Sequence, residues 1–273
     1  MSLRQALSPK EPRIFGVTAA ASVVCLIAYW IARDLGPWSP KRGLGLVFGI
    51  LAALLFVFEM LYPGRRPRAR PLGTAKAWLQ AHVYLGAIAL LGVLIHSDFG
   101  LPHGGMGWSL LLLSAWTTGT GLAGVWLQKW IPASLSDGLR VEALYERIPA
   151  LTGQLTEEAD RLVEEASSDA LARFYRTEVR KRLAVVAPSW DYLFDVRRGR
   201  DRALEPFRRM TRFVAEQERG AVEDLEQIYI EKLELDAQYS LQGILRRWLI
   251  LHAPPAGLLM GLLAIHVFTW VLY

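Results

Sequence analysis

Long apolar runs separated by short polar segments make up most of the chain. Five of these runs are long enough to cross a bilayer, because a helix that rises about 1.5 Å per residue needs roughly 20 residues to span the hydrocarbon core. Helix is the expected form, since hydrocarbon offers the backbone no other hydrogen-bond partner. The predicted spans cover Ile14 to Ala32, Gly43 to Tyr62, Ala77 to Ile95, Gly107 to Trp130 and Trp248 to Tyr273.

Residues 133–247 interrupt this pattern with a charged stretch in which apolar residues recur at helical spacing. Such a pattern is typical of helices that bury one face. The pattern predicts an all-α integral membrane helix bundle of five spans, with four spans in residues 1–132, a helical cytoplasmic insert in 133–247 and the fifth span in 248–273. The predicted insert helices cover Leu139 to Ala166, Asp169 to Val186, about Glu205 to Glu218, and Ala221 to Leu245, the last running on into the fifth span, with a turn at Arg197 to Arg202.

The charges are divided unevenly between the insert and the spans. The insert holds 22 of the 26 acidic residues, whereas the other 158 residues hold 4 acidic and 12 basic residues. All five histidines and the single cysteine lie in the apolar fraction. One cysteine excludes a disulfide framework, a zinc cluster and covalent haem attachment through C-x-x-C-H. The composition predicts contact with the lipid bilayer and disfavours nucleic acid as a partner.

The basic residues of the short connections predict the orientation. The connection between the second and third spans is strongly basic and has no acid, so it is expected in the cytoplasm together with the N-terminus and the insert. The connection from Ser97 to Met106 has Asp98 and no Lys or Arg, as expected outside. The first connection runs against this rule, because it places Arg33, Lys41 and Arg42 outside. The basic residues of the cytoplasmic connection are Arg65, Arg66, Arg68, Arg70 and Lys76.

Two of the predicted spans each carry a pair of histidines. His82 and His96 lie fourteen residues apart in the third span, and His252 and His266 have the same spacing in the fifth. Fourteen residues advance a helix by about 21 Å and nearly four whole turns, so the two imidazoles of each pair share one helix face. Because the insert leaves and re-enters on one side, the two helices run parallel. His82 is then level with His252, and His96 with His266.

Ionisable side chains inside a membrane are costly and therefore mark candidate functional sites. Two imidazoles that face each other across a bundle are the axial ligands of a six-coordinate haem, so the two levels predict two haems with these four histidines as the iron ligands. Gly86 and Gly92 lie one turn from a ligand histidine, where they would let a flat macrocycle approach the backbone. Packing roles for the histidines and the glycines are the alternative. Zinc or copper would need its ligands in one coordination sphere.

The paired histidine helices resemble the di-haem transmembrane cytochrome b of respiratory complexes that oxidise quinol or reduce quinone. The stretches Trp78–His82 and Trp248–His252 are also similar to bacterial membrane cytochrome b-like proteins. The resemblance covers the third to fifth spans, and the long insert departs from it. It implies that the two haems are non-covalent haem b with low-spin iron, held by His82 with His252 and by His96 with His266. It also implies transmembrane electron transfer as the cytochrome b subunit of a larger oxidoreductase in a bacterial inner membrane, with other subunits as partners and a quinone as a candidate partner.

Several further residues have a functional and a structural interpretation, and no catalytic residue is predicted. His103 and Asp98 could serve an outer quinone site or be ordinary loop residues. Glu59 could handle protons, reach the headgroups or pair with arginines. The insert lacks histidine, cysteine and a phosphate loop, so we expect it to dock partners or to be structural. The alternatives to electron transfer are a non-redox scaffold whose insert docks partner proteins, and a proton or metal transporter, which the scarcity of carboxylates in the spans disfavours.

Overall fold

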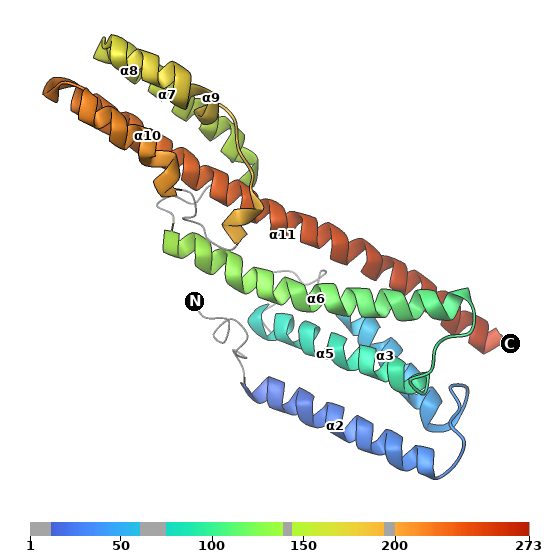
Figure 1. The fold of residues 1–273 in the computed structure, drawn as a ribbon. Helices are drawn as coiled ribbons and strands as arrows, with labels where there is room; N and C mark the ends of the chain where they lie inside the picture. The colour runs from blue at the N-terminus through green and yellow to red at the C-terminus, as the bar shows by residue number, and fades with distance from the viewer. Residues whose placement is uncertain (1–11, 61–74, 139–143, 194–199, 273) are drawn as a thin grey trace. The chain divides into compact units, whose positions relative to one another are not determined.

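The structure is a computed structural model, and it describes residues 12–60, 75–138, 144–193 and 200–272. All regular secondary structure within these ranges is helical, which confirms the predicted all-α class for them. The chain divides into two compact units, one of residues 1–127 with 248–273 and one of residues 128–247 (Figure 1). Each unit is described by itself.

Four of the described helices are long and apolar enough to cross a membrane. They are α2 (Pro12–Asp34), α5 (Ala75–His96), α6 (Gly105–Gly138) and α11 (Arg219–Leu272). The fifth apolar helix, α3 (Gly43–Glu59), is shorter, with 17 residues. The predicted second span extends to Tyr62 and is followed by the basic connection. Residues 61–74, which include Arg65, Arg66, Arg68 and Arg70, lie outside the described residues.

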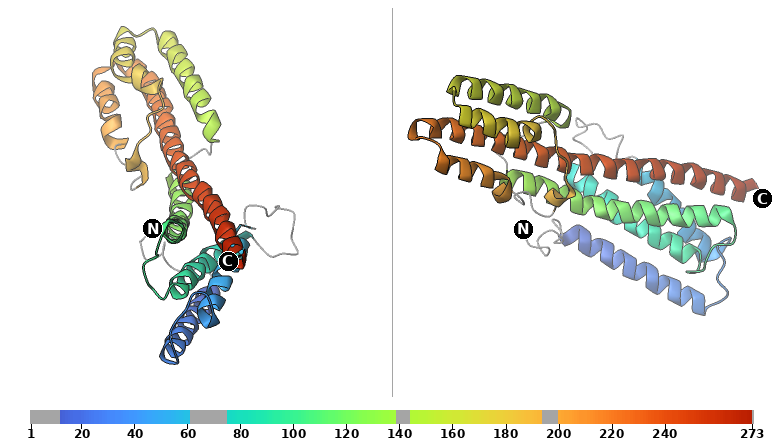
Figure 2. Two further views of the ribbon diagram at one scale, coloured as in Figure 1. Left: turned by 90° about the vertical axis from the view of Figure 1, so that its right-hand side faces the viewer. Right: turned by 45° about the horizontal axis from the view of Figure 1, so that its top comes forward.

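The first unit is a bundle in which α3 packs along α5 and α2 also contacts α5 (Figure 2). Tyr29, Phe48 and Ile95 form a buried cluster between α2, α3 and α5. A second cluster around Phe56 and Leu259 joins α3 and α5 to α11. Many other large apolar side chains of these helices are exposed. An apolar surface of this extent is compatible with lipid contact and hence with an integral membrane protein.

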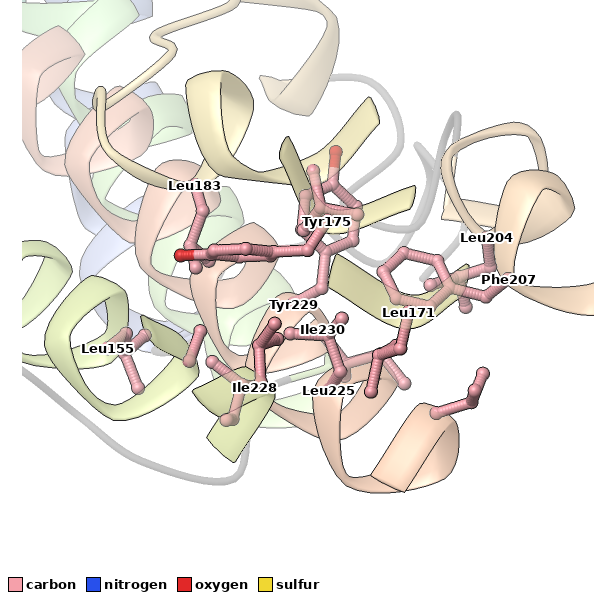
Figure 3. Packing of buried hydrophobic residues seen from close by; sticks show 14 of the residues in the cluster. Leu155, Leu171, Tyr175, Leu183, Leu204, Phe207, Leu225, Ile228, Tyr229 and Ile230 are labelled. Atoms are coloured by element: carbon pink, nitrogen blue, oxygen red, sulfur yellow. The ribbon is translucent and has the colours of Figure 1, made fainter. Parts of the chain in front are cut away.

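The second unit has an apolar core of its own. Its helices are α7 (Ile148–Ala166), α8 (Asp169–Phe174), α9 (Arg180–Leu183), α10 (Arg200–Phe213) and the first part of α11. Tyr175, Phe207 and Tyr229 lie at the centre of the core, surrounded by leucines and isoleucines (Figure 3). The rings of Phe207 and Tyr229 are 5.3 Å apart. This core gives the insert a packed interior as well as surface charge.

The predicted boundaries of the insert helices differ from those observed. The first predicted helix begins at Leu139, whereas α7 begins at Ile148, where Pro149 fits the first turn because its missing N–H would have no partner there. Residues 139–143 lie outside the described part. The second predicted helix consists of α8, a π-helical turn (Tyr175–Val179) and α9, and it ends at Leu183. Ser168 caps its start by accepting a hydrogen bond from the Leu171 N–H.

The third predicted helix, Glu205 to Glu218, is displaced towards its N-terminal side in the structure. Helix α10 covers Arg200–Phe213, so Arg200 and Arg202 belong to a helix and not to the predicted turn. Arg197 and Arg198 lie outside the described residues. A separate 3-10 turn, Glu216–Glu218, precedes α11. The final helix is continuous from Arg219 to Leu272, as the sequence predicts, and it includes Pro254 and Pro255.

The buried part of α11 carries polar groups that hold the segment after α9. Lys232 and Asp236 form a buried ion pair, with Nζ 2.5 Å from Oδ2. The other oxygen of Asp236 accepts a hydrogen bond from the Ala187 N–H at 3.0 Å. Ser240 Oγ accepts one from the Ser189 N–H at 3.0 Å. These bonds satisfy two backbone donors in a segment that has left the helix, which a buried donor requires.

Candidate functional site

The structure brings the imidazole of His82 on α5 next to that of His252 on α11. Their ring centroids are 6.2 Å apart and their planes are nearly perpendicular, at 82°. Both residues are half-buried and both belong to the first unit. The two histidines therefore share one level of the bundle, which is the pairing that parallel helices predict.

His82 is held by Glu59, the last residue of α3. A carboxylate oxygen of Glu59 contacts Nδ1 of His82, and the Glu59 side chain is only 10% exposed. An ionised carboxylate only accepts hydrogen bonds, so a neutral His82 ring beside it would carry its proton on Nδ1 and its lone pair on Nε2. A carboxylate behind a histidine in this way fixes the orientation of the ring, as it does at many metal sites.

His252 is held by α6 through Thr120. Nδ1 of His252 lies 2.9 Å from the Thr120 hydroxyl. That hydroxyl donates its own proton to the Trp116 carbonyl at 2.7 Å, so it accepts from the His252 Nδ1–H. The indole of Trp248 stacks on the His252 ring at 5.6 Å and donates to the Thr120 carbonyl at 2.8 Å. His252 therefore has the same tautomer as His82.

Glycines on α6 provide the space for this arrangement. A Cβ at Gly124 would overlap the indole ring of Trp248, and one at Gly121 would lie 3.4 Å from Cε1 of His252. The sequence suggests only tight helix packing for these two glycines. In the structure they allow the stacked Trp248 and His252 side chains to approach the α6 backbone.

Trp116 compensates for a proline in α11. Pro255 has no N–H, so it leaves the carbonyl of Leu251, four residues earlier, without its usual partner. The Trp116 indole N–H donates to that carbonyl at 2.8 Å. This bond satisfies a group that hydrocarbon could not satisfy, and it ties α11 to α6 one residue before His252.

The imidazole of His96, near the other end of α5, contacts the backbone of α3. The Nδ1–H of His96 donates to the Gly45 carbonyl at 2.8 Å. A Cβ at Gly49 would lie 2.5 Å from that same Nδ1, so only glycine leaves room for the ring. The partner predicted for His96 is His266 on α11, and this pairing stays a prediction. The proton on Nδ1 of His96 again leaves the lone pair on Nε2.

The two candidate glycines of α5 have different surroundings. A Cβ at Gly86 would meet nothing within 4 Å, so its surroundings are open. A Cβ at Gly92 would lie 3.0 Å from the Cβ of Ala52 on α3. Gly92 thus allows close packing of α5 on α3, and its predicted contact with a macrocycle stays a prediction.

The other candidate residues lie at helix ends and in loops. Asp98, just past α5, accepts a hydrogen bond from the Tyr29 hydroxyl at 2.8 Å and forms an ion pair with Arg33. His103 is exposed in the loop before α6. Within the described ranges, no three His, Cys, Asp or Glu side chains gather as a metal-binding group. Axial ligation of a haem needs only two.

Reasoning from sequence missed the partners of the histidines. The sequence makes Glu59 a candidate for proton handling, headgroup contact or arginine pairing, but it gives no sign of the contact with His82 or of the roles of Thr120 and the Gly45 carbonyl. The available signal was the rarity of acids in the spans. Comparison with known proteins adds nothing to these residues, because no family model, curated protein or solved structure matches the chain.

Proposed function

We propose that this protein transfers electrons across a membrane through two haems b, one held by His82 and His252 and the other by His96 and His266. The observation that carries the proposal is the approach of His82 and His252 from separate helices, with Nδ1 of His82 in contact with the Glu59 carboxylate and Nδ1 of His252 hydrogen-bonded to Thr120. The arrangement matches the resemblance to di-haem cytochrome b.

The residues present fit such a group at the level of His82. The imidazoles of His82 and His252 would hold the iron between them as its two protein ligands. The separation of the His82 and His252 centroids is 6.2 Å. The open surroundings of Gly86, Gly257 and Gly261 also fit a flat macrocycle close to the backbone.

Haem b supplies a reversible one-electron couple when bound between two imidazoles. The contribution of this chain is position and environment. Glu59, Thr120 and the Gly45 carbonyl orient three of the four imidazoles. Half-burial of the histidines in an apolar bundle keeps water away from them, and two histidines on one helix place the two sites about 21 Å apart along the membrane normal.

We place five spans in the membrane, with α3 and the residues that follow it as the second. Parallel α5 and α11 then put the insert on the cytoplasmic side of a bacterial inner membrane. The ion pair of Arg33 with Asp98 supports this orientation, because it neutralises one of the basic residues that would otherwise oppose it. In this orientation, His82 and His252 lie near the cytoplasmic surface, and His96 and His266 near the outer surface.

We further propose that the chain serves as the cytochrome b subunit of a larger oxidoreductase, with a quinone as the candidate electron donor or acceptor. The insert contributes a packed core and an exposed surface, on which Phe213 is 86% exposed. An exposed phenylalanine of this kind favours contact with another subunit.

The test is the absorbance of the purified protein from haem-replete cells. We expect reduced-minus-oxidised bands of low-spin haem b at two haems per chain. His82→Ala and His252→Ala should each remove one and the same haem, and His96→Ala and His266→Ala the other, while His103→Ala keeps both. A colourless wild-type protein would contradict the proposal. Removal of the same haem by His82→Ala and His266→Ala would contradict the pairing.

A scaffold that docks partner proteins through the insert is the second candidate function. The separate core of the insert and its exposed Phe213 favour it. Capture of the same partner by a colourless protein and by a haem-replete protein would support this candidate over electron transfer.

A further inference from the structure

The groups that contact the Nδ1 atoms of the histidines differ in charge. His252 and His96 donate to neutral oxygens, the Thr120 hydroxyl and the Gly45 carbonyl. His82 instead contacts the carboxylate of Glu59. The level of His82 and His252 therefore has an anionic acceptor behind one of its two imidazoles, whereas the acceptor that the structure gives His96 at the other level is neutral.

Glu59 occupies an unusual place for an acid. It ends an apolar helix of 17 residues, and its side chain is 10% exposed. A carboxylate buried in this way costs free energy unless a partner compensates it, and the partner that the structure gives Glu59 is the imidazole of His82. Two acids at the outer ends of α2 and α5 have different surroundings, because Asp34 is exposed at the end of α2 and Asp98, just past α5, pairs with Arg33.

An anionic acceptor changes what an imidazole donates to a metal. The carboxylate draws the Nδ1 proton towards itself and so raises the electron density and basicity at Nε2. Greater donation from Nε2, together with a negative charge nearby, stabilises ferric iron relative to ferrous iron. A neutral hydroxyl or carbonyl has the same effect to a smaller degree.

We propose that Glu59 is a positioning residue that lowers the reduction potential of the haem held by His82 and His252. This inference rests on the proposed function. Reduction adds one electron to that haem, the Nδ1 proton stays between His82 and Glu59 in both oxidation states, and no bond to His82 forms or breaks. The two haems therefore differ in potential partly because of one side chain on α3.

The experiment is a redox titration of the full-length protein in membranes, followed by the haem b absorbance. Glu59→Gln keeps the size of the side chain and a hydrogen-bond acceptor but removes the negative charge. We expect one of the two midpoint potentials to rise and the other to stay at the wild-type value. Asp34→Asn removes the same charge from an exposed site and should move neither potential. In Glu59→Asp, which keeps an acid, the same midpoint potential should lie between those of the wild type and of Glu59→Gln.

The outcomes separate this inference from the proposed function. Unchanged potentials in a Glu59→Gln protein that keeps both haems would overturn the role of Glu59 and leave the haem proposal standing. A wild type without haem would remove the proposed function, and the inference with it. If the Glu59→Gln protein loses a haem, the redox titration of Glu59→Asp is the test. The shorter aspartate lengthens the contact with His82, so we expect the midpoint potential of the haem at His82 and His252 to rise. An unchanged midpoint potential in Glu59→Asp would overturn the inference.

Discussion

The ring centroids of His82 on α5 and His252 on α11 lie 6.2 Å apart, although 170 residues separate the two histidines in the sequence. Each ring is oriented by a third helix, His82 by Glu59 of α3 and His252 by Thr120 of α6. Four helices of the first unit, α3, α5, α6 and α11, therefore carry or orient this histidine pair. This arrangement leads to the following expectations.

Gly49→Ala should disturb His96 specifically. The added Cβ would lie 2.5 Å from Nδ1, so the ring must move and its hydrogen bond to the Gly45 carbonyl must lengthen. We expect loss of one of two haems per chain, the same one that His96→Ala removes, measured by haem content and absorbance. Retention of both haems with unchanged spectra would show that haem binding does not depend on the space that Gly49 leaves for the His96 ring.

Gly86→Leu tests whether a cofactor occupies the space beside α5. A Cβ at this position meets no protein atom within 4 Å, so the first atom of the new side chain has room. We expect the haem of the His82 level to be lost while the helix content measured by circular dichroism is unchanged. Gly153→Leu, also in open surroundings but on α7 of the insert, is the control and should keep both haems.

Trp116→Phe should weaken the contact between α6 and α11. It leaves the Leu251 carbonyl without the indole N–H, so we expect a lower free energy of unfolding. Reversible unfolding in mixed micelles measures the loss. The decisive comparison uses Pro255→Ala, which restores a backbone N–H for that carbonyl. In the Pro255→Ala protein, Trp116→Phe should lower the free energy of unfolding much less than it does in the wild type. An equal loss of free energy in both proteins would show that Trp116 does not compensate for Pro255.

Asp236→Leu should destabilise the insert strongly. The side chains of Lys232 and Asp236 are 3% and 2% exposed, and removal of one partner leaves a buried charge at a cost of about 3–5 kcal/mol. The double variant Lys232→Met with Asp236→Leu should be more stable than the single one, because no unpaired charge remains. Thermal unfolding of the three proteins measures this order, and a double variant that is less stable than the single one would contradict it.

Asp160→Asn should lower stability at neutral pH and have no effect in acid. The Arg180 guanidinium, 2.9 and 3.1 Å from the carboxylate oxygens, holds the pKa of Asp160 below its usual value. Because the folded pKa is the lower one, the contribution is complete above the unfolded pKa of about 3.9 and is lost as the pH falls through the folded pKa. Both side chains are partly exposed, so we expect less than about 1 kcal/mol.

The measurement for this pair is the melting temperature of the wild type and of Asp160→Asn between pH 7 and pH 2.5. The two curves should converge towards the acid end. Asp201→Asn in a more exposed ion pair on α10 serves as the control, with no measurable difference expected at any pH. A constant offset between wild type and Asp160→Asn over the whole range would show that the ion pair is not the cause.

The pattern of apolar and polar residues predicts the helices of the first unit more closely than the helices of the insert. Apolar runs mark α2, α5 and α6 to within a few residues at their starts, because hydrocarbon leaves helix as the only open-chain solution. In the insert, the start of α7 depends on Pro149, and the end of the second helix coincides with bonds to Asp236 and Ser240 of α11. Contacts so distant in sequence leave no periodic signal.

The sequence by itself determined that the chain is helical, which segments are apolar enough for a membrane, and that two helices each carry two histidines on one face. These properties follow from composition and from the 3.6-residue repeat, which are local. Only the tertiary structure decided that Glu59 contacts His82, that Thr120 holds His252, that Gly49 makes room for His96, and that Arg33 is neutralised by Asp98. Each of these pairs joins different helices or helix ends, and it forms because a polar group in an apolar bundle must find its partner on whichever neighbour packing brings close.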